Sequence, residues 1–454
     1  MMQTSATPLV DTETEWQPAA ALPRGRVGAY AWYVAVVLAI AQLMSGLDRY
    51  LMSVVLEPVK ADLQLTDSQL GLLTGTSFAI VFCIASVPLG RLSDIVHRRS
   101  LIAVGITFWS LSVLACGFAN SFEALFAARL GIGLGEAALL PAAVSLLTAY
   151  FTPATLTQGL AVFTTGNSLG RATAFLGGGA LLAALTATGG LALPGLTAMR
   201  PWQGVMIIAG LIGFCVALLC LTIREPRRLR RRGDGNKFRG SLDYFWRRRA
   251  VYLRVFLLYG LCVGSATALA TWMISLYVRN YGVAASNASM IVGSVSLVIG
   301  PLGNMIGGWL TDRLAARGVA GAGLIVGAGA LALTPFAGIA FSTIHSLEVA
   351  IVVYGLVYFA LSGAGPACLS SVQLMTPGEH RGLISSLYLC VYSLIGFGLG
   401  PLVVGLCNDY LFRSTAAIPF SLLTTFLLFA GFGVPVALYG RAACQREMQA
   451  IVEV

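Results

Sequence analysis

Charged residues are scarce in this sequence. They make up 11% of its 454 residues, whereas hydrophobic residues make up 57%, and the mean hydropathy is +0.82. Soluble domains carry about 25% charged residues, so this composition excludes a soluble protein and indicates an integral membrane protein. The alternating ten-residue segments of outer-membrane barrels are also missing. Apolar runs of the length of a membrane-spanning helix recur along the chain instead.

Motifs of metal sites, disulfide frameworks and nucleotide-dependent enzymes are absent too. The nine cysteines are an odd number, and no Cys-x-x-Cys pair or Cys/His cluster occurs among them, which argues against a disulfide framework and a metal site. No Walker A, His-Glu-x-x-His, Gly-x-Ser-x-Gly or Rossmann glycine pattern stands in a suitable strand–helix context. We therefore expect no cofactor, no enzyme activity and no transport driven by ATP.

Positive charge is concentrated in one segment. The formal net charge is +10, and eleven Lys or Arg against three Asp or Glu lie between Arg224 and Arg249. This distribution indicates a cytoplasmic loop under the positive-inside rule rather than a nucleic-acid surface, with contact to anionic lipids as a possible addition.

Twelve apolar runs are long enough to cross a bilayer, six on each side of the basic segment. They fall at 30–56, 67–92, 100–119, 122–148, 158–185, 202–223, 250–278, 286–310, 321–342, 348–374, 381–407 and 416–440. Loops with Lys or Arg alternate with loops poor in them, so both termini are predicted to be cytoplasmic in a multi-pass protein of the inner (plasma) membrane. The expected parts are a cytoplasmic tail (1–29), a six-helix bundle (30–223), a basic cytoplasmic linker (224–249), a second six-helix bundle (250–441) and a cytoplasmic tail (442–454).

The two halves repeat each other. Gly90-Arg-Leu-Ser-Asp94-Ile-Val-His-Arg98-Arg99 follows the second span, and Gly308-Trp-Leu-Thr-Asp312-Arg313 follows the eighth. Internal duplication with parallel halves is the architecture of transporters that rock around a site at the middle of the membrane. We therefore predict an all-α membrane protein with twelve transmembrane helices in two pseudo-symmetric six-helix bundles.

These paired motifs resemble the loop signature of the major facilitator superfamily. More narrowly, Leu47-Asp48-Arg49-Tyr50, Asp67-Ser68-Gln69-Leu-Gly71 and Arg129-x-x-x-Gly133-x-Gly135-Glu136 resemble the spinster branch, as in a bacterial homologue. The resemblance covers nearly the whole chain. It implies alternating access, proton coupling at the charged positions of the first and fourth spans, and a phospholipid or lysolipid-like substrate.

Charged side chains inside the spans are confined to the N-terminal half. They are Asp48, Arg49, Arg129, Glu136 and Arg171, and the C-terminal spans hold none well inside their limits. An ionisable group in hydrocarbon costs at least about 2.5 kcal/mol, so it needs a function. A buried carboxyl group favours its neutral form and a nearby arginine favours the carboxylate, so a change in either can load or release a proton.

We predict that Asp48, Arg49, Arg129 and Glu136 form a cluster that couples transport to protons. Arg129 and Glu136 are seven residues apart and so share one helix face; Glu136 is the better proton carrier and Arg129 its tuner. A static ion network that fixes helix packing is the alternative.

The predicted substrate is an amphipathic anion such as a lysophospholipid or a sphingosine-phosphate-like lipid, because cations on one wall and apolar or aromatic residues on the other suit such a molecule. The candidate contacts are Arg49, Arg129, Arg171, Thr271, Trp272, Tyr358, Ser370 and Gln373. Arg171 could instead pair with Asp48 or Glu136. We expect the chain to work as a monomer. The alternatives are a proton-coupled carrier of small organic anions or drugs, and a lipid-binding membrane sensor that does not transport.

The repeated loop motif is also a candidate conformational latch. Its residues are Gly90, Asp94, Arg98, Arg99, Asp312, Arg313 and Arg381. The resemblance implies that the aspartates meet arginines and a helix N-terminus of the other half and favour the outward-open state. Ile95 and His97 replace the usual Arg and Gly of the motif, so the first-half latch is expected to be the weaker one. Plain loop charges at a membrane edge are the alternative.

Overall fold

The computed structural model describes residues 28–152, 155–191, 199–226, 235–319, 321–377 and 380–452, and almost all of them are helical. Twelve helical stretches of this described part are long and apolar enough to cross a membrane, as the sequence predicted. The first half contains α1 (Ala29–Val54), α2 (Leu56–Leu63), α3 (Asp67–Gly71), the π-helical turn η1 (Leu72–Thr76), α4 (Ser77–Ile95), α5 (Arg98–Phe118), α6 (Phe122–Glu136), α7 (Leu139–Tyr150), α8 (Leu156–Ala187) and α9 (Pro201–Cys220). The second half contains α10 (Gly235–Tyr281), α11 (Ala285–Ala316), α12 (Ala322–Thr343), α13 (Leu347–Leu374), α14 (Arg381–Tyr392), η2 (Ser393–Leu399), α15 (Gly400–Leu406), η3 (Cys407–Phe412) and α16 (Ile418–Val452).

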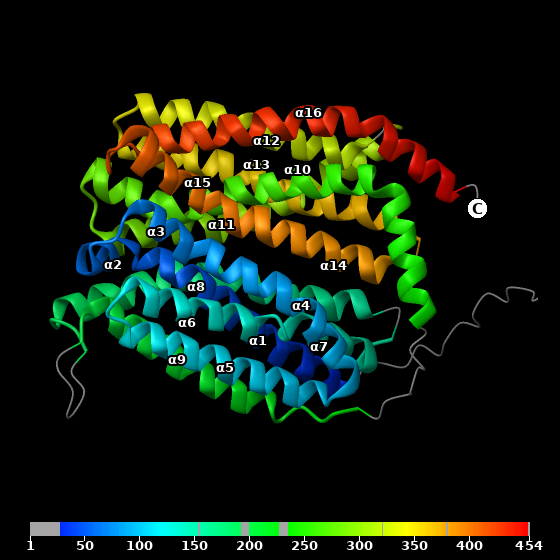
Figure 1. Cartoon of the computed structure of the whole chain (residues 1–454), viewed down its shortest axis with the longest axis horizontal. Coiled ribbons are helices and arrows are strands. Elements are labelled where there is room, and N and C mark those ends of the chain that lie inside the picture. Colours follow the sequence, from blue (N-terminus) through cyan, green and yellow to red (C-terminus); the bar gives the residue numbers. More distant parts are fainter. Residues whose placement is uncertain are drawn as a thin grey trace, which may run out of the picture.

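The helices form two bundles that lie side by side. Figure 1 shows α1–α9, in blue to green, below α10–α16, in green to red, with the spans running roughly parallel. The end of the molecule where α9 ends and α10 begins also carries the last turns of α16, and we call it the linker end. The opposite end, which carries α2 and α3, is the far end.

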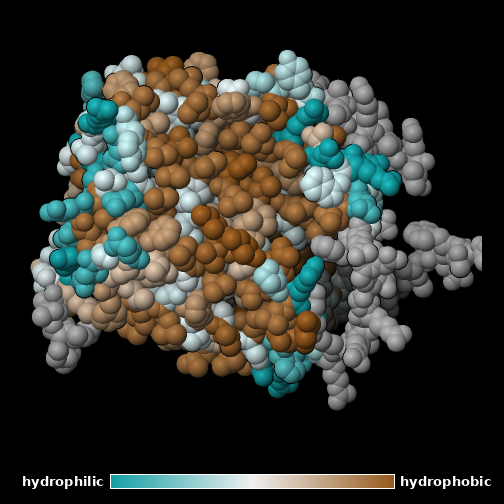
Figure 2. All heavy atoms as spheres, viewed as in Figure 1, coloured by the Kyte–Doolittle hydropathy of each residue, from teal (hydrophilic) through white to brown (hydrophobic). Residues whose placement is uncertain are grey.

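The outer surface matches a bilayer. Figure 2 shows an apolar middle, with hydrophilic residues gathered toward the two ends. Large side chains such as Ile84, Met305 and Phe432 are 70%, 72% and 67% exposed, which is costly in water and favourable against lipid tails.

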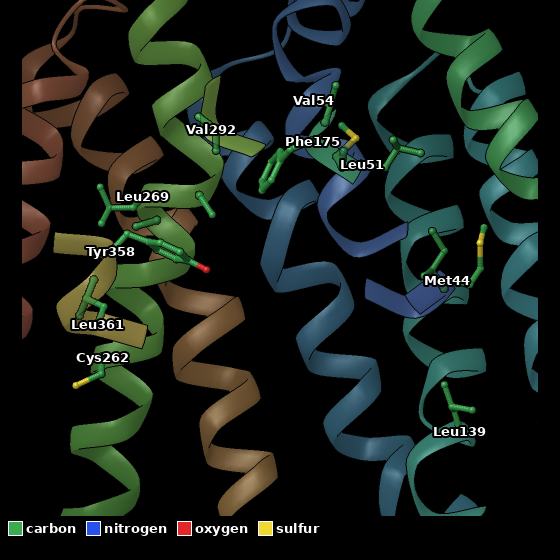
Figure 3. Packing of buried hydrophobic residues seen from close by; sticks show 14 of the residues in the cluster. Met44, Leu51, Val54, Leu139, Phe175, Cys262, Leu269, Val292, Tyr358 and Leu361 are labelled. Carbon is green, nitrogen blue, oxygen red and sulfur yellow. The ribbon is translucent and has the colours of Figure 1, made fainter. Parts of the chain in front are cut away.

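Close packing within the first bundle depends on small residues. A Cβ at Gly166 or Gly170 of α8 would overlap the carbonyl oxygen of Ala39 or Leu43 of α1, so glycine is needed at both positions for the helices to approach this closely. Farther along the same pair of helices, Figure 3 shows Phe175 of α8 beside Leu51 of α1 and facing α11.

The two bundles meet most closely in the half of the molecule toward the far end. The hydroxyl of Ser289 on α11 donates to the carbonyl of Phe175 on α8 at 2.7 Å, and Thr76 of η1 donates to the carbonyl of Gly398 in η2 at 2.8 Å. A Cβ at Gly75 would overlap the carbonyl of Phe397. The π-helical turns η1 and η2 are thus a tight contact between bundles, and such turns are frequent at functional sites.

Two segments predicted to lie outside the spans are partly helical. Within the predicted linker (224–249), α10 begins at Gly235 and runs to Tyr281. The segment predicted as a tail from 442 is helical as far as Val452 in α16. The predicted tail 1–29 lies outside the described residues except for its last two positions.

Candidate functional site

Glu136 lies where the fourth span is interrupted. It is the last residue of α6, and α7 begins at Leu139. Pro141 has no backbone N–H to donate to the carbonyl four residues earlier, which breaks the helical ladder at this point. Glu136 is 2% exposed. Its Oε2 accepts hydrogen bonds from Nη2 of Arg49 at 2.5 Å and from the hydroxyl of Ser45 at 2.7 Å.

Arg49 connects this carboxylate to the opposite bundle. Its guanidinium carbon lies 4.6 Å from the ring centroid of Phe78 on α4 and 4.9 Å from that of Phe397 in η2. A desolvated guanidinium over an aromatic face is stabilised by about 2 kcal/mol. A change in the charge of Glu136 therefore alters the electrostatic environment of Arg49, which also contacts the second bundle.

Asp48 and Arg129 lie beside this pair but make different contacts. Asp48 is 2% exposed and has Glu136, Arg129 and the indole of Trp109 as polar neighbours, but neither of its carboxyl oxygens makes a hydrogen bond of standard geometry among the described residues. Arg129 donates to three main-chain carbonyls, those of Leu73 at 3.0 Å, Thr74 at 3.3 Å and Asp48 at 3.3 Å. The structure thus brings the four predicted cluster residues together, with Arg49 rather than Arg129 as the direct partner of Glu136.

Arg171 lies on the wall of a central cavity between the bundles. This cavity has a volume of about 220 Å³, and we call it the central cavity. The guanidinium lies 4.9 Å from the ring centroid of Tyr358 on α13 and 5.7 Å from that of Tyr50 on α1. Neither Nε of Arg171 nor the hydroxyl of Tyr358 has a hydrogen-bond partner among the described residues. Both polar groups are thus buried and unpaired at the wall of the cavity.

Two further cavities continue from the central one toward the linker end. The coupling cavity, about 190 Å³, is lined by Arg49 and Glu136 and shares Asn167, Tyr392 and Phe397 with the central cavity. The apolar cavity, about 540 Å³, lies between α4, α7 and α14 and shares Phe82, Leu140 and Leu389 with the coupling cavity. The three cavities are neighbours that share lining residues, and their polarity falls from the Arg171 end to the linker end.

Tyr259 and Tyr392 of the second bundle line the central cavity, and Tyr388 stacks beside them. The Tyr259 ring on α10 stacks on the rings of Tyr388 and Tyr392 of α14, with centroids 5.1 and 5.4 Å apart. Sequence reasoning missed these residues. Tyr388 and Tyr392 are four residues apart, the spacing that places two side chains on one helix face, and this signal could have revealed them.

The predicted contacts of the C-terminal half do not lie together. Tyr358 lines the central cavity. Gln373 donates from Nε2 to the hydroxyl of Ser385, which lines the apolar cavity, at 3.0 Å. Trp272 donates from its indole to the carbonyl of Pro401 at 2.9 Å, Ser370 donates to the carbonyl of Ala367 at 2.9 Å, and Thr271 is buried. The last three line none of these three cavities.

The candidate latch residues are spread over the linker end. Gly90 lines the apolar cavity, Arg98 is partly buried, and the side chain of Asp94 lies outside the described residues. The backbone N–H of Arg99 donates to Oε2 of Glu225 at 3.0 Å, and Nε of Arg381 donates to the carbonyl of Thr376 at 3.0 Å. Each of these two contacts joins residues of the same half of the chain, the first half for Arg99 and the second for Arg381.

Asp312 and Arg313 complete the latch set on the second bundle. Asp312 is exposed, and the exposed Arg313 has its guanidinium 5.3 Å from the ring centroid of Trp309. Both residues therefore lie on the surface of the linker end in this structure.

The far end is closed by a buried ionic network that sequence reasoning did not assemble. Asp67 is 0% exposed and accepts from Arg279 of α10 through two bonds, at 2.8 and 3.0 Å. Lys60 and Asn408 also donate to its carboxylate. Arg279 additionally pairs with Glu57 at 2.9 Å. The network joins the first bundle to the second at the end opposite the hollow.

Two repeated six-helix bundles with charged groups buried at their interface, closed at one end and hollow at the other, define a membrane transporter of the alternating-access class. Residues 38–401 match the profile of the Major Facilitator Superfamily. The chain belongs to this family, whose members are transporters and not enzymes.

Known proteins of this family resemble the chain at low identity. An MFS-type efflux pump of Mycolicibacterium smegmatis is 27% identical over 84% of this chain and 85% of its own length. The protein spinster of Drosophila melanogaster is 24% identical over 87% of this chain and 65% of its own length. A crystal structure of a bacterial homologue of the human lysosomal transporter spinster, in an inward-facing, occupied conformation, superposes with a TM-score of 0.77 at 23% identity, over 92% of this chain and 98% of that one. These likenesses support the predicted fold.

Proposed function

We propose that the protein is a proton-coupled secondary transporter that moves an amphipathic anionic lipid across the membrane by alternating access. The observation that carries the proposal is the position of Arg49. It pairs with Glu136 at 2.5 Å, lies over Phe397 of the other bundle and lines the coupling cavity. One cation is thus shared by a titratable group, the bundle interface and the substrate path.

The coupling step follows from the charge of this pair. When Glu136 is ionised, it holds Arg49 and neutralises its charge. When Glu136 takes a proton, Arg49 loses its anionic partner, and a buried cation without one is strongly unfavourable. An anionic headgroup arriving from the central cavity then replaces it. Proton and headgroup therefore control the same guanidinium, and Asp48, buried without a hydrogen-bond partner in the described residues, is a second proton site beside it.

The shape of the substrate follows from the series of cavities. The central cavity offers Arg171 and several hydroxyl and amide groups to an anionic headgroup. The apolar cavity, lined by groups such as Phe82, Val87, Leu140 and Val144, offers room for an acyl chain. A lysophospholipid or a sphingosine-phosphate-like lipid carries both parts, and the sphingosine-1-phosphate transporter of Danio rerio is 24% identical to this chain over 61% of it.

A carrier of small organic anions is the second candidate. The central cavity alone, at about 220 Å³ and with a polar lining, suits a small anion. The probable L-galactonate transporter of Escherichia coli is 23% identical over 82% of this chain. A small anion would occupy the central cavity and make no contact with the apolar cavity.

The remaining parts of the proposal concern placement in the cell. The basic residues of the linker support a cytoplasmic position for the linker end and both termini in the inner membrane. With this orientation, the state described here is open inward. The latch residues at that end then close it in the opposite state. All three cavities lie within one chain, so the monomer is the proposed working unit.

Purified protein in proteoliposomes tests the proposal. A pH gradient should drive movement of a fluorescent lysophosphatidic acid and leave lysophosphatidylcholine, whose headgroup has no net charge, nearly unmoved. Movement of gluconate or galactonate without the lysolipid would favour the second candidate. Lipid binding without movement of the lipid across the membrane would indicate a lipid-binding sensor.

A further inference from the structure

The first turns of α10 reach beyond any membrane span. The helix has 47 residues, or about 70 Å at 1.5 Å per residue, more than twice the roughly 30 Å of a bilayer core. Figure 1 shows its first turns, in bright green, crossing the linker end instead of continuing along the span. We call residues 240–252 the linker helix.

One face of the linker helix is fixed to the turn between α13 and α14. The hydroxyl of Ser241 and Nδ1 of His380 are 2.9 Å apart, and the Tyr244 ring stacks on the His380 ring at 4.4 Å. The hydroxyl of Tyr252 donates to the carbonyl of Met375 at 3.0 Å. Because two spans end and begin at this turn, the linker helix lies level with the edge of the bilayer.

The opposite face combines arginines with an exposed tryptophan. Trp246 is 53% exposed. The exposed Arg247 and Arg249 flank it on the helix surface, and the exposed Asp243 lies one turn before it. Nη1 of Arg249 donates to the carbonyl of Trp246 at 3.1 Å, and its guanidinium carbon lies 5.5 Å from a Trp246 ring centroid. An aromatic ring beside cations is the pattern of helices that lie in the headgroup layer.

We infer that this face of the linker helix is a docking surface for anionic phospholipids of the bilayer. The guanidinium groups of Arg247 and Arg249 bind the phosphates, and Trp246 inserts among the headgroups. Charge complementarity favours this occupant, since the linker helix carries three arginines and one aspartate and the cytoplasmic leaflet is negative. The surface is distinct from the substrate cavities, so the inference does not depend on the proposed substrate or on proton coupling; it rests on the cytoplasmic orientation of the linker end proposed above.

Lipid binding here has a consequence for the transport path. The inner face contacts Met375 and His380, and α14 begins at the next residue, Arg381. Leu383, Ser385 and Ser386 of α14 line the apolar cavity. Anionic lipids bound to the linker helix thus stabilise one wall of the apolar cavity, although they do not enter it.

Hydrogen exchange in nanodiscs tests the inference. The backbone amides of residues 240–252 and 380–386 in the wild-type protein should exchange at least about threefold more slowly in an equal mixture of phosphatidylcholine and phosphatidylglycerol than in phosphatidylcholine alone, because a bound ligand suppresses local opening. High salt should reduce the difference, since exposed charges are screened.

Two variants complete the test. The double variant R247Q/R249Q should lose the lipid effect. R317Q, which removes another exposed arginine from the same end of the molecule, should keep it. Equal exchange of the wild type in both lipids, or an effect of phosphatidylglycerol that survives in R247Q/R249Q, would overturn the inference.

Discussion

Nη2 of Arg49 lies 2.5 Å from Oε2 of Glu136, with side chains that are 10% and 1% exposed. The pair joins α1 to the interrupted end of α6, and it faces a cavity that the second bundle helps to line. A buried ion pair that only fixed packing would have little reason to line a cavity. The predictions below separate that static role from a role in transport.

Neutralising the two carboxyl groups should uncouple transport from protons. Glu136→Gln and Asp48→Asn remove a titratable proton and keep the side-chain volume, so folding should survive. Substrate-dependent proton movement should fall at least about tenfold, the low end of what loss of a proton-transfer group costs in enzymes. Glu123→Gln, an exposed position at the start of the same helix as Glu136, is the matched control. If both neutral variants carry substrate with the wild-type pH dependence, these residues do not couple.

Replacing the guanidinium of Arg129 by an ammonium group should lower the stability of the folded protein. A lysine at this position has a single ammonium group and cannot reach the three carbonyls that Arg129 bonds. Arg129→Lys should therefore lower the free energy of unfolding by about 3 kcal/mol, measured by thermal unfolding in detergent. Wild-type stability combined with lost coupling would instead make Arg129 a direct member of the proton pathway.

Arg171 should discriminate substrates by headgroup charge. Because it lies among tyrosines with an unpartnered Nε in the described structure, Arg171→Ala should weaken binding of an anionic lysolipid about tenfold or more. Binding of a zwitterionic lysolipid of equal chain length should change little. Arg171→Lys should recover part of the loss. Equal losses for both lipids would show that Arg171 serves packing, and fluorescence titration with the two lipids measures the difference.

Breaking the far-end network should open that end. Arg279→Gln removes the two bonds to Asp67 and the pair with Glu57. The closed arrangement should lose about 2 kcal/mol, a factor of about 30 in the ratio of closed to open molecules. Electron-spin distances between labels at Gln64 and Ser414, both exposed at the far end, should shift to longer values. Arg413→Gln, an exposed arginine at the same end, should leave the distribution unchanged.

The architecture could be predicted from the sequence because its signals are local. Span length and the repeated loop motif are read directly from consecutive residues, and the twelve spans follow from them. The buried charges could be identified for the same reason. Their pairing could not, because adjacent residues such as Asp48 and Arg49 point about 100° apart. Only the rotation of α1 against α6 decides that Arg49 meets Glu136.

The second-bundle wall was the least predictable part. Thr271, Trp272 and Tyr259 lie in the same span of α10. Only Tyr259 of these three lines the central cavity. Hydropathy does not resolve which face of a wholly apolar helix turns toward the partner bundle. The π-helical turns η1 and η2 likewise depend on contact between distant segments.

The central claim is that Glu136 takes up and releases a proton as Arg49 binds and releases the substrate headgroup. Internal pH recorded in proteoliposomes, on addition of an anionic lysophospholipid without any imposed gradient, tests it most directly. The account predicts a substrate-evoked pH change in the wild type that is lost in Glu136→Gln and kept in Glu123→Gln. Lysolipid movement with no pH change in the wild type, or an undiminished change in Glu136→Gln, would contradict it.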